Sequence, residues 1–356
     1  MDSVTLKEEQ SRPARSTQHF FDMLRHYREL VLARICELVP RNRYQRTLYG
    51  PMLEYPMREG KGFRPALCLA MCQACGGRME EALDTAAAIE MFHNAFLIHD
   101  DIEDESESRR GFPTLHHQYG IAIATNVGDG LNMLAMRTLL GNTRTLGLER
   151  ALMLIFEIER MARESTEGQS IELDWVRFNR AGVTVREYLR MSCKKTCWYT
   201  CIAPLRTGAL IANVRPAELA AINAFGFKTG AAFQIQDDVL NLTAEMALYG
   251  KEIGGDIAEG KRTVIVVHLI AHAKPADRRR ILDIYGRRRT DKSADDVAFV
   301  LACMRRYGSI RFASDLARRL TDSAARTFAQ RFAWLPPSPY RRFLEEMIDY
   351  MIERQL

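Results

Sequence analysis

The sequence of 356 residues contains no run of roughly 18 uninterrupted apolar residues, the length that a membrane-spanning helix needs. It also carries little net charge, because 50 basic residues against 45 acidic ones leave an excess of only +5. Such an excess does not by itself indicate nucleic-acid or membrane binding. The polar N-terminus has no signal-peptide pattern. We therefore expect a cytoplasmic protein without a transmembrane segment and without a nucleic-acid partner.

Two catalytic or metal-binding patterns are missing as well. The eight cysteines include one CxxC, formed by Cys72 and Cys75, but no second pair at the spacing of a zinc site. We interpret the cysteines as reduced core residues. No Ser-His-Asp or Cys-His arrangement of a nucleophilic enzyme is visible. Any chemistry must therefore come from other groups.

Strand-type alternation is scarce, whereas helical periodicity dominates the chain from residue 19 onward. Phe20, Met23, Leu24 and Tyr27 follow the i, i+3, i+4, i+7 spacing of one helix face. Glycine and proline mark turns at 51–65, 109–113, near 182, at 204, around 250–260, at 275 and at 335–339. None resembles an interdomain linker. We expect a flexible N-terminal extension over residues 1–17 and a single large all-α domain over 18–356, packed around a central cavity.

The stretch from Ala86 to Asp104 is predicted to be a helix, because it is rich in helix formers and has neither glycine nor proline. Asp100 and Asp104 are four residues apart and share one face, with Asp101 beside them. Like charges at a helix C-terminus are unfavourable, so a cation should compensate them. Carboxylates in this pattern suit Mg²⁺ bridged to substrate phosphates, although an acidic helix end exposed to water is the alternative.

The same helix face continues below the acids. Phe92 and Phe96 are spaced by four from each other and from Asp100, and His93 is close to the same side. The aromatic residues alone would fit an ordinary core stripe. Together with the acidic end, they favour a ligand tunnel that descends from a metal site.

A second helix of the same kind is predicted at residues 233–242. Asp237 and Asn241 are four residues apart, and Asp238 is adjacent to Asp237. Two such helices facing each other across a cavity would hold metal ions between them.

Basic residues stand near turns in two other segments. Arg109 and Arg110 precede a Gly-Phe-Pro turn, and Lys61 and Arg64 lie in the sequence GKGFRP. Guanidinium groups match phosphate oxygens bidentately, and a rigid turn would hold them in place. These segments are therefore candidates for phosphate binding.

Four motifs in this order, GKGFRP, HNAFLIHDDIEDES, RRGFPTLHHQYG and FQIQDDVLNL, resemble the trans-isoprenyl diphosphate synthase family over roughly residues 20–350. The sequences of these motifs are most similar to those of geranylgeranyl diphosphate synthases. The resemblance implies antiparallel helices around a deep cavity, a homodimer, and Mg²⁺ as cofactor, with three ions when substrate is bound. It implies isopentenyl diphosphate and an allylic diphosphate as substrates.

The resemblance also implies residue roles. The metal residues would be Asp100, Asp101, Asp104, Asp237 and Asp238, with Asn241 at best auxiliary because the family often has a third aspartate there. The allylic diphosphate would be held by Arg109, Lys195, Thr196, Gln234, Lys251 and Lys261. Isopentenyl diphosphate would be surrounded by Lys61, Arg64, His93, Arg110 and Phe233. Among these, the catalytic set would be Asp100, Asp101, Asp104, Arg109, Lys195, Asp237 and Lys251. We interpret Lys194 and Arg262 as surface residues.

The chemistry would be ionisation of the allylic diphosphate followed by attack of the isopentenyl double bond, with metal and cationic side chains stabilising the leaving pyrophosphate. Product length would depend on the residues one and two turns below the acids, Phe96 and Phe92, with the small Ala95 leaving one flank open. We expect a C20 product, with C15 as the alternative.

Two other functions stay open. A class I terpene cyclase shares the first acidic cluster, and Asp237, Asn241 and Glu245 have the spacing of its second metal motif. A cyclase, however, has no second diphosphate to bind and does not explain Lys61 and Arg64. A non-catalytic partner subunit would generally lose acids from one or both clusters, whereas this chain keeps all but one of the expected aspartates.

Overall fold

The computed structural model describes residues 15–58, 60–243 and 254–352. Within these ranges the chain is almost entirely helical, and the only strands are β1 (Ser108–Arg109) and β2 (Phe112–Pro113), which pair antiparallel. The N-terminal half contains α1 (Arg15–Leu38), η1 (Gln45–Tyr49), α2 (Gly50–Met57), α3 (Phe63–Ala74), α4 (Met79–Glu103), α5 (Leu115–Tyr119), α6 (Ile121–Thr145) and α7 (Leu148–Arg177). The predicted all-α fold is confirmed.

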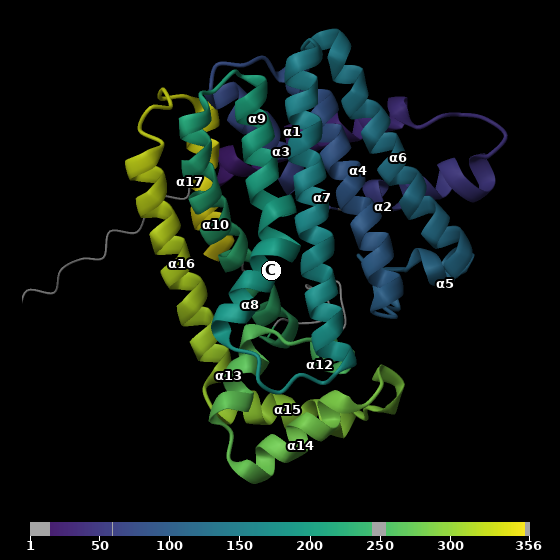
Figure 1. Ribbon diagram of the computed structural model, residues 1–356, viewed down its shortest axis with the longest axis vertical. Helices are drawn as coiled ribbons and strands as arrows, with labels where there is room; N and C mark the ends of the chain where they lie inside the picture. Colours follow the sequence, from purple (N-terminus) through teal and green to yellow (C-terminus); the bar gives the residue numbers. More distant parts are fainter. Residues whose placement is uncertain (1–14, 59, 244–253, 353–356) are drawn as a thin grey trace, which may run out of the picture.

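The C-terminal half continues with further helices and ends on two long ones. These are α8 (Val185–Ser192), η2 (Cys193–Ile202), α9 (Ala203–Ile211), α10 (Pro216–Thr243), α12 (Gly255–Glu259), α13 (Val264–His272), α14 (Pro275–Gly286), η3 (Arg289–Asp291), α15 (Ala294–Arg306), α16 (Ser309–Arg331) and α17 (Pro339–Ile352). The long helices run side by side along the molecule, whereas α13, α14 and α15 form a smaller lobe at one end (Figure 1).

Hydrophobic packing follows this division. One large cluster of buried side chains joins α1, α3, α4, α6 and α9, and a second lies under α13–α16 and the end of α10. Helix α4 is central: it packs against α3 and α6, and nearly every side chain from residue 85 to residue 95 is buried. Because this stretch is buried on all sides it is mostly apolar, and three of its polar residues, Glu90, His93 and Asn94, share one face.

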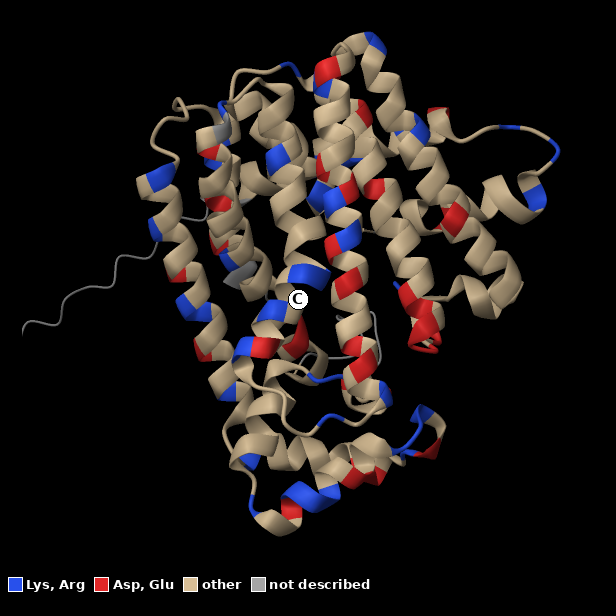
Figure 2. Ribbon diagram, in the orientation of Figure 1, with Lys and Arg blue, Asp and Glu red and all other residues tan. Residues whose placement is uncertain are grey.

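The acidic end of α4 forms as predicted, although the helix begins earlier, at Met79 instead of Ala86. Its last turn carries Asp100 and Asp101, and Asp104 is the C-cap. Acidic residues gather at this end of α4, next to the gap between the bundle and the smaller lobe (Figure 2). The metal-site end of the expected ligand tunnel therefore lies on the side of the bundle that faces the smaller lobe.

The predicted break at Pro204 is wrong. Helices α8, η2 and α9 follow one another without a gap from Val185 to Ile211, and Pro204 stands in the first turn of α9. The segment before it is π-helical, and the N–H of Ala203 donates to the carbonyl of Trp198, five residues back. Because these turns are wider than α-helical ones, the proline does not meet the i−4 conflict that would end a regular helix.

Candidate active site

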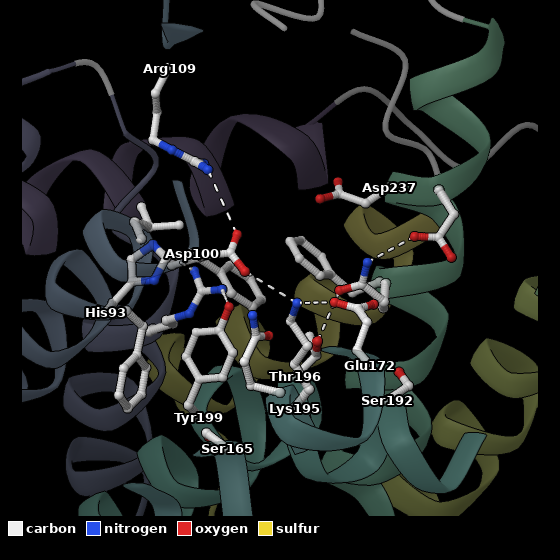
Figure 3. A pocket seen from close by; sticks show the side chains of 18 of the residues that line it. His93, Asp100, Arg109, Ser165, Glu172, Ser192, Lys195, Thr196, Tyr199 and Asp237 are labelled. Carbon is white, nitrogen blue, oxygen red and sulfur yellow. Dashed lines mark hydrogen bonds and ion pairs between the residues drawn. The ribbon is translucent and has the colours of Figure 1, made fainter. Parts of the chain in front are cut away.

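A cavity of about 930 Å³ lies between α4, α7, η2, α10 and α12. This volume is near the upper end of the range for small-molecule sites, roughly 300–1,000 Å³. Its wall contains both of the predicted acidic helices and most of the predicted cations. Figure 3 shows Arg109, Asp100, Lys195 and Glu172 linked across one side of it, with Asp237 on the other. Side chains that are far apart in the sequence thus surround one space.

Asp100 and Asp104 each meet a predicted diphosphate-binding lysine. The Lys195 Nζ donates to Asp100 Oδ1 at 3.2 Å, and the Lys261 Nζ donates to Asp104 Oδ2 at 2.6 Å. Burial, together with the charges of Asp100 and Glu259, raises the pKa of Asp104 to about 7, although Lys261 opposes the shift. Acids and cations therefore neutralise each other in part, and a diphosphate with its metal could exchange partners with both.

Asp101 lies elsewhere. Its carboxylate is fully buried, accepts from the Tyr55 hydroxyl at 2.6 Å, and accepts from Arg109 Nε at 2.7 and 2.9 Å. Neither Asp101 nor Asp104 is among the residues that line the cavity, whereas their partners Arg109 and Lys261 both line it. Asp101 therefore holds Arg109, and both of its carboxylate oxygens already accept hydrogen bonds.

The second cluster divides in the same way. Asp237 and Asp238 both line the cavity, but Asp238 is buried and accepts from Tyr188 at 2.8 Å and from Gln234 Nε2 at 2.9 Å. Burial, with the charge of Asp256 added, raises the pKa of Asp238 well above its usual value.

Asn241 forms hydrogen bonds with the segment that begins α12. Its backbone carbonyl accepts from Gly254 N, and its Oδ1 accepts from Asp256 N at 3.3 Å. It therefore ties the end of α10 to the start of α12. Glu245, the third residue of the cyclase-like spacing, lies outside the described residues.

Lys195 is held in the wall by α7. The Glu172 carboxylate accepts a very short hydrogen bond from Lys195 Nζ, and Asp100 takes a second one. Although burial alone would lower the pKa of Lys195, these two carboxylates raise it, so the side chain is charged. Gly168 allows this contact, because a Cβ there would collide with the backbone nitrogen of Lys195.

A separate group of predicted residues surrounds the side of the cavity near His93. Arg64 Nη1 lies 3.2 Å from His93 Nε2, and the Arg64 guanidinium lies 4.5 Å from the centre of the Tyr199 ring. Burial lowers the pKa of His93 well below its usual value, and the charges of Arg64 and Arg110 add to the effect. His93 is therefore neutral and can accept a hydrogen bond from Arg64.

The remaining residues of this group lie nearby. Lys61 Nζ lies 5.4 Å from the centre of the Tyr350 ring, and Phe63 stacks on Phe233 at 6.0 Å. Arg110 Nη1 donates to the backbone carbonyl of Tyr55 at 3.1 Å. The cations at this side thus form a second group, distinct from Lys195 and Lys261.

Other predicted residues have different outcomes. Thr196 lines the cavity and donates to Gln234 Oε1 at 3.0 Å, whereas Lys251 lies outside the described residues. Lys194 is a partly exposed ion-pair partner of Glu164 and Glu167, as expected.

Arg262 was wrongly interpreted as a surface residue. It is among the largest fully buried side chains, donates to the carbonyls of Arg180 and Gly260 and to Asn179 Oδ1, and stacks on Tyr285. Carbonyl oxygens at the turns that precede α8 and α13 explain how this guanidinium is tolerated inside the protein, since each of its three nitrogen atoms donates to one of them.

The expected chain-length residues do not all reach the cavity. Phe96 lines it and meets Tyr199 edge-on, with ring centres 5.8 Å apart. Phe92 is buried behind Phe96, and neither it nor the fully buried Ala95 lines the cavity. Asn132 of α6 and Ser165 of α7 also line the cavity. The floor therefore rests on more helices than α4.

Several wall residues were missed by sequence reasoning. Tyr199 is four residues after Lys195, and Glu90 is three residues before His93. Residues at these spacings share a helix face, so the sequence could have indicated both. Glu172 and Asp256 had no such signal in our reading, because only packing brings α7 and α12 to the cavity.

The acids fit a metal that arrives with its ligand. Among residues 15–58, 60–243 and 254–352, no three His, Cys, Asp or Glu side chains form a ready-made metal cluster. Mg²⁺ does not need one, because it keeps several waters and binds through one or two carboxylates together with substrate phosphates. Asp100 and Asp237 stand on opposite sides of the cavity, which leaves room for such an arrangement (Figure 3).

In the described part of the chain, no helix combines the length and apolarity needed to cross a membrane.

Comparison with known proteins identifies the family. Residues 45–304 match the family model for polyprenyl synthetase. The chain belongs to the polyprenyl synthetase family. A short chain isoprenyl diphosphate synthase of Methanothermobacter thermautotrophicus is 33% identical over 336 residues, which cover 94% of this chain and 98% of that protein. These matches confirm the predicted family and a prenyltransferase activity. They favour a synthase over the two alternatives, a terpene cyclase and a non-catalytic subunit.

Solved structures of polyprenyl synthetases agree with the fold. A geranylgeranyl pyrophosphate synthetase of Pyrococcus horikoshii has a TM-score of 0.84 and 32% identity, with 95% of this chain and 99% of that one covered. A polyprenyl synthase of Caulobacter crescentus, complexed with calcium and isoprenyl diphosphate, has a TM-score of 0.84 and 26% identity, with 97% and 100% covered. The all-α bundle around a cavity is therefore the fold of this family.

Proposed function

We propose that this polyprenyl synthetase joins isopentenyl diphosphate head-to-tail to an allylic diphosphate, with Mg²⁺, and releases geranylgeranyl diphosphate (C20). Farnesyl diphosphate (C15) is the alternative product. The observation that carries the proposal is the presence of two separate cation groups in one cavity: Lys195 and Lys261 beside the acids, and Arg64 and Lys61 beside His93. Two diphosphates need two such groups, and a cyclase needs only one.

The cavity residues support the ionisation step. Cleavage of the allylic carbon–oxygen bond leaves a carbocation and pyrophosphate, whose new negative charge lies beside Lys195, Lys261 and Arg109. Preorganised charges in a partly dry site stabilise such a leaving group. The double bond of isopentenyl diphosphate then forms the new carbon–carbon bond, and the departing proton goes to pyrophosphate.

The proposed metal residues are Asp100, Asp104 and Asp237. A bound divalent ion would supply Lewis-acid stabilisation of the pyrophosphate oxygens. The calcium and isoprenyl diphosphate bound by the Caulobacter relative support this use of a divalent metal. We propose three ions when substrate is present, and we assign Asp101 and Asp238 a supporting role.

A primer assay tests this function. The purified full-length chain, Mg²⁺ and labelled isopentenyl diphosphate are combined with dimethylallyl, geranyl or farnesyl diphosphate in turn, and products are measured by mass spectrometry. We expect elongation of every accepted primer to C20 and none without metal. A chain that elongates no primer would contradict the proposal, and a product that stops at C15 would select the alternative.

We further propose a homodimer formed through the outer face of α6 and α7. These helices pack side by side and expose a stripe of large apolar side chains: Met133, Leu140, Leu148, Leu152 and Phe156. Contiguous exposed apolar surface is typical of an interface. We also propose a single cytoplasmic domain over residues 18–356. Of the expected extension over residues 1–17, residues 1–14 lie outside the described residues, and residues 15–17 belong to α1 (Arg15–Leu38), so the helix begins earlier than expected.

Charge placed on this face should separate the subunits. We expect the double variant Leu152→Glu, Phe156→Glu to elute as a monomer in size-exclusion chromatography with light scattering, because two carboxylates cannot be buried unpaired. Phe178→Glu is the matched control: Phe178 is 65% exposed and Phe156 is 68% exposed, but Phe178 lies at the far end of α7. A dimeric double variant would rule out this face.

A further inference from the structure

Asp101 and Asp238, the buried aspartates of the two acidic clusters, are held by the same kind of contact. Asp101 and Asp238 are both buried, and each accepts a hydrogen bond from a tyrosine hydroxyl, at 2.6 Å from Tyr55 and 2.8 Å from Tyr188. Both tyrosines are only 1% exposed. They come from different helices, Tyr55 from α2 and Tyr188 from α8. Two unrelated helices thus supply the same contact.

Each aspartate also holds a group that faces the cavity. Asp101 takes both Nε and Nη2 of Arg109, the latter at 2.5 Å, and Arg109 lines the cavity within 4.0 Å of Asp100. On the other side, Asp238 Oδ1 accepts from Gln234, whose Oε1 accepts from Thr196. Both connections run from a tyrosine, through a buried carboxylate, to a residue of the proposed allylic site.

We propose that Tyr55 and Tyr188 are matched positioning residues for the allylic diphosphate. Each fixes the buried aspartate of one cluster, so that Arg109 on one wall and the Gln234–Thr196 pair on the other point at the same ligand. Neither hydroxyl touches the reacting atoms. The identity of the ligand rests on the proposed function, but the positioning itself rests on the contacts.

The physical reason is the cost of a buried carboxylate that lacks donors. Without the hydroxyl, Asp101 keeps only Arg109 and can rotate with it, and Asp238 keeps only Gln234. Tyr55 has a second function, because its oxygen also accepts from Leu115 N at 3.2 Å. It therefore ties α2 to the end of the hairpin segment that carries Arg109.

Phenylalanine variants remove only the hydroxyls. We expect Tyr55→Phe and Tyr188→Phe each to weaken pyrophosphate binding about tenfold, the effect of losing one hydrogen bond to a charged group. Calorimetry with Mg²⁺ measures this in the presence of saturating isopentenyl diphosphate, which occupies the other site. The KM for the allylic primer should rise to a similar extent, while the KM for isopentenyl diphosphate changes by less than about twofold.

Tyr27→Phe is the matched control. Tyr27 is also buried and donates to a side-chain oxygen, Gln73 Oε1 at 2.7 Å, but it does not line the cavity or contact an acidic cluster. We expect it to lower Tm as the other two variants do and to leave pyrophosphate affinity and both KM values unchanged. The double variant Tyr55→Phe, Tyr188→Phe should lose about a hundredfold, because the two sites share no partner.

The outcomes separate this inference from the proposed function. Product formation with unchanged pyrophosphate affinity in both variants would overturn the positioning role and leave the synthase function standing. Tight pyrophosphate binding that weakens in the variants, without product from any primer, would support the positioning role and refute the synthase function. If either variant fails to fold, Asp101→Asn and Asp238→Asn, which keep the tyrosines, should show the same tenfold loss. Their unchanged affinity would overturn the inference.

Discussion

Asp104→Asn is expected to lower kcat by about a thousandfold while the protein remains as stable as the wild type at pH 8. Loss of one preorganised charge at the position of a developing anion typically costs about 10²–10³ in rate. Asp104 is the C-cap of α4 and accepts from the Nζ of Lys261, which lines the cavity together with Asp100. The measurement is kcat with a saturating primer, together with Tm by differential scanning fluorimetry.

The stability part follows from the pKa of Asp104, which burial raises to about 7 from an ordinary value of 3.8. The folded state therefore binds a proton more tightly than the unfolded chain does. The contribution of this carboxyl to stability is fully present below pH 3.8 and is lost as the pH rises through 7. At pH 8 burial disfavours the ionised Asp104, so asparagine removes that penalty, which offsets the loss of the ion pair with Lys261. The negative charge of Asp104 therefore does not stabilise the folded state, and we attribute its presence to metal binding.

Asp84→Asn provides the control on the same helix. Asp84 pairs with Arg34 at 2.6 Å near the other end of α4 and lines no cavity. We expect a small loss of Tm, of the order of a surface ion pair, and an unchanged kcat. If Asp104→Asn and Asp84→Asn have the same kcat as the wild type, Asp104 is not part of the catalytic site.

Phe96→Ala is expected to shift the product from C20 to longer chains, by one or more five-carbon units. The Phe96 ring lines the cavity, and its removal opens space against Tyr199 and Phe92. Because Phe96 is only partly buried, the cost in stability should be below the roughly 3–5 kcal/mol of a fully buried Phe→Ala change. Mass spectrometry of the products and the free energy of unfolding test both parts.

Phe92→Ala separates the cavity floor from the core behind it. The sequence pattern predicts that both rings limit product length, but Phe92 is buried and does not reach the cavity wall. We therefore expect Phe92→Ala to cost the full roughly 3–5 kcal/mol and to leave product length unchanged. Unchanged product length in Phe96→Ala would instead place the floor on other helices, at Asn132 or Ser165.

Periodicity along a single helix was enough to predict part of the site. The four-residue spacing of Phe96, Asp100 and Asp104 dictates one face, because an α-helix repeats every 3.6 residues. The lack of glycine and proline before these acids correctly predicted a helix. The family resemblance, carried by the order of four motifs, predicted which cations share the cavity.

Tertiary structure decided which of two adjacent acids lines the cavity. Asp100 and Asp101 differ by one position, and only the arrival of Tyr55 and Arg109 from other segments turns Asp101 inward. Arg262 is buried for the same kind of reason, since its acceptors at Asn179 and Arg180 are 83 and 82 residues away in the chain. The sequence by itself determined the helices, their acidic ends and the chemistry available. The partners of each side chain, and hence its role, were decided by packing, because burial and hydrogen bonding depend on contacts between segments that local spacing does not encode.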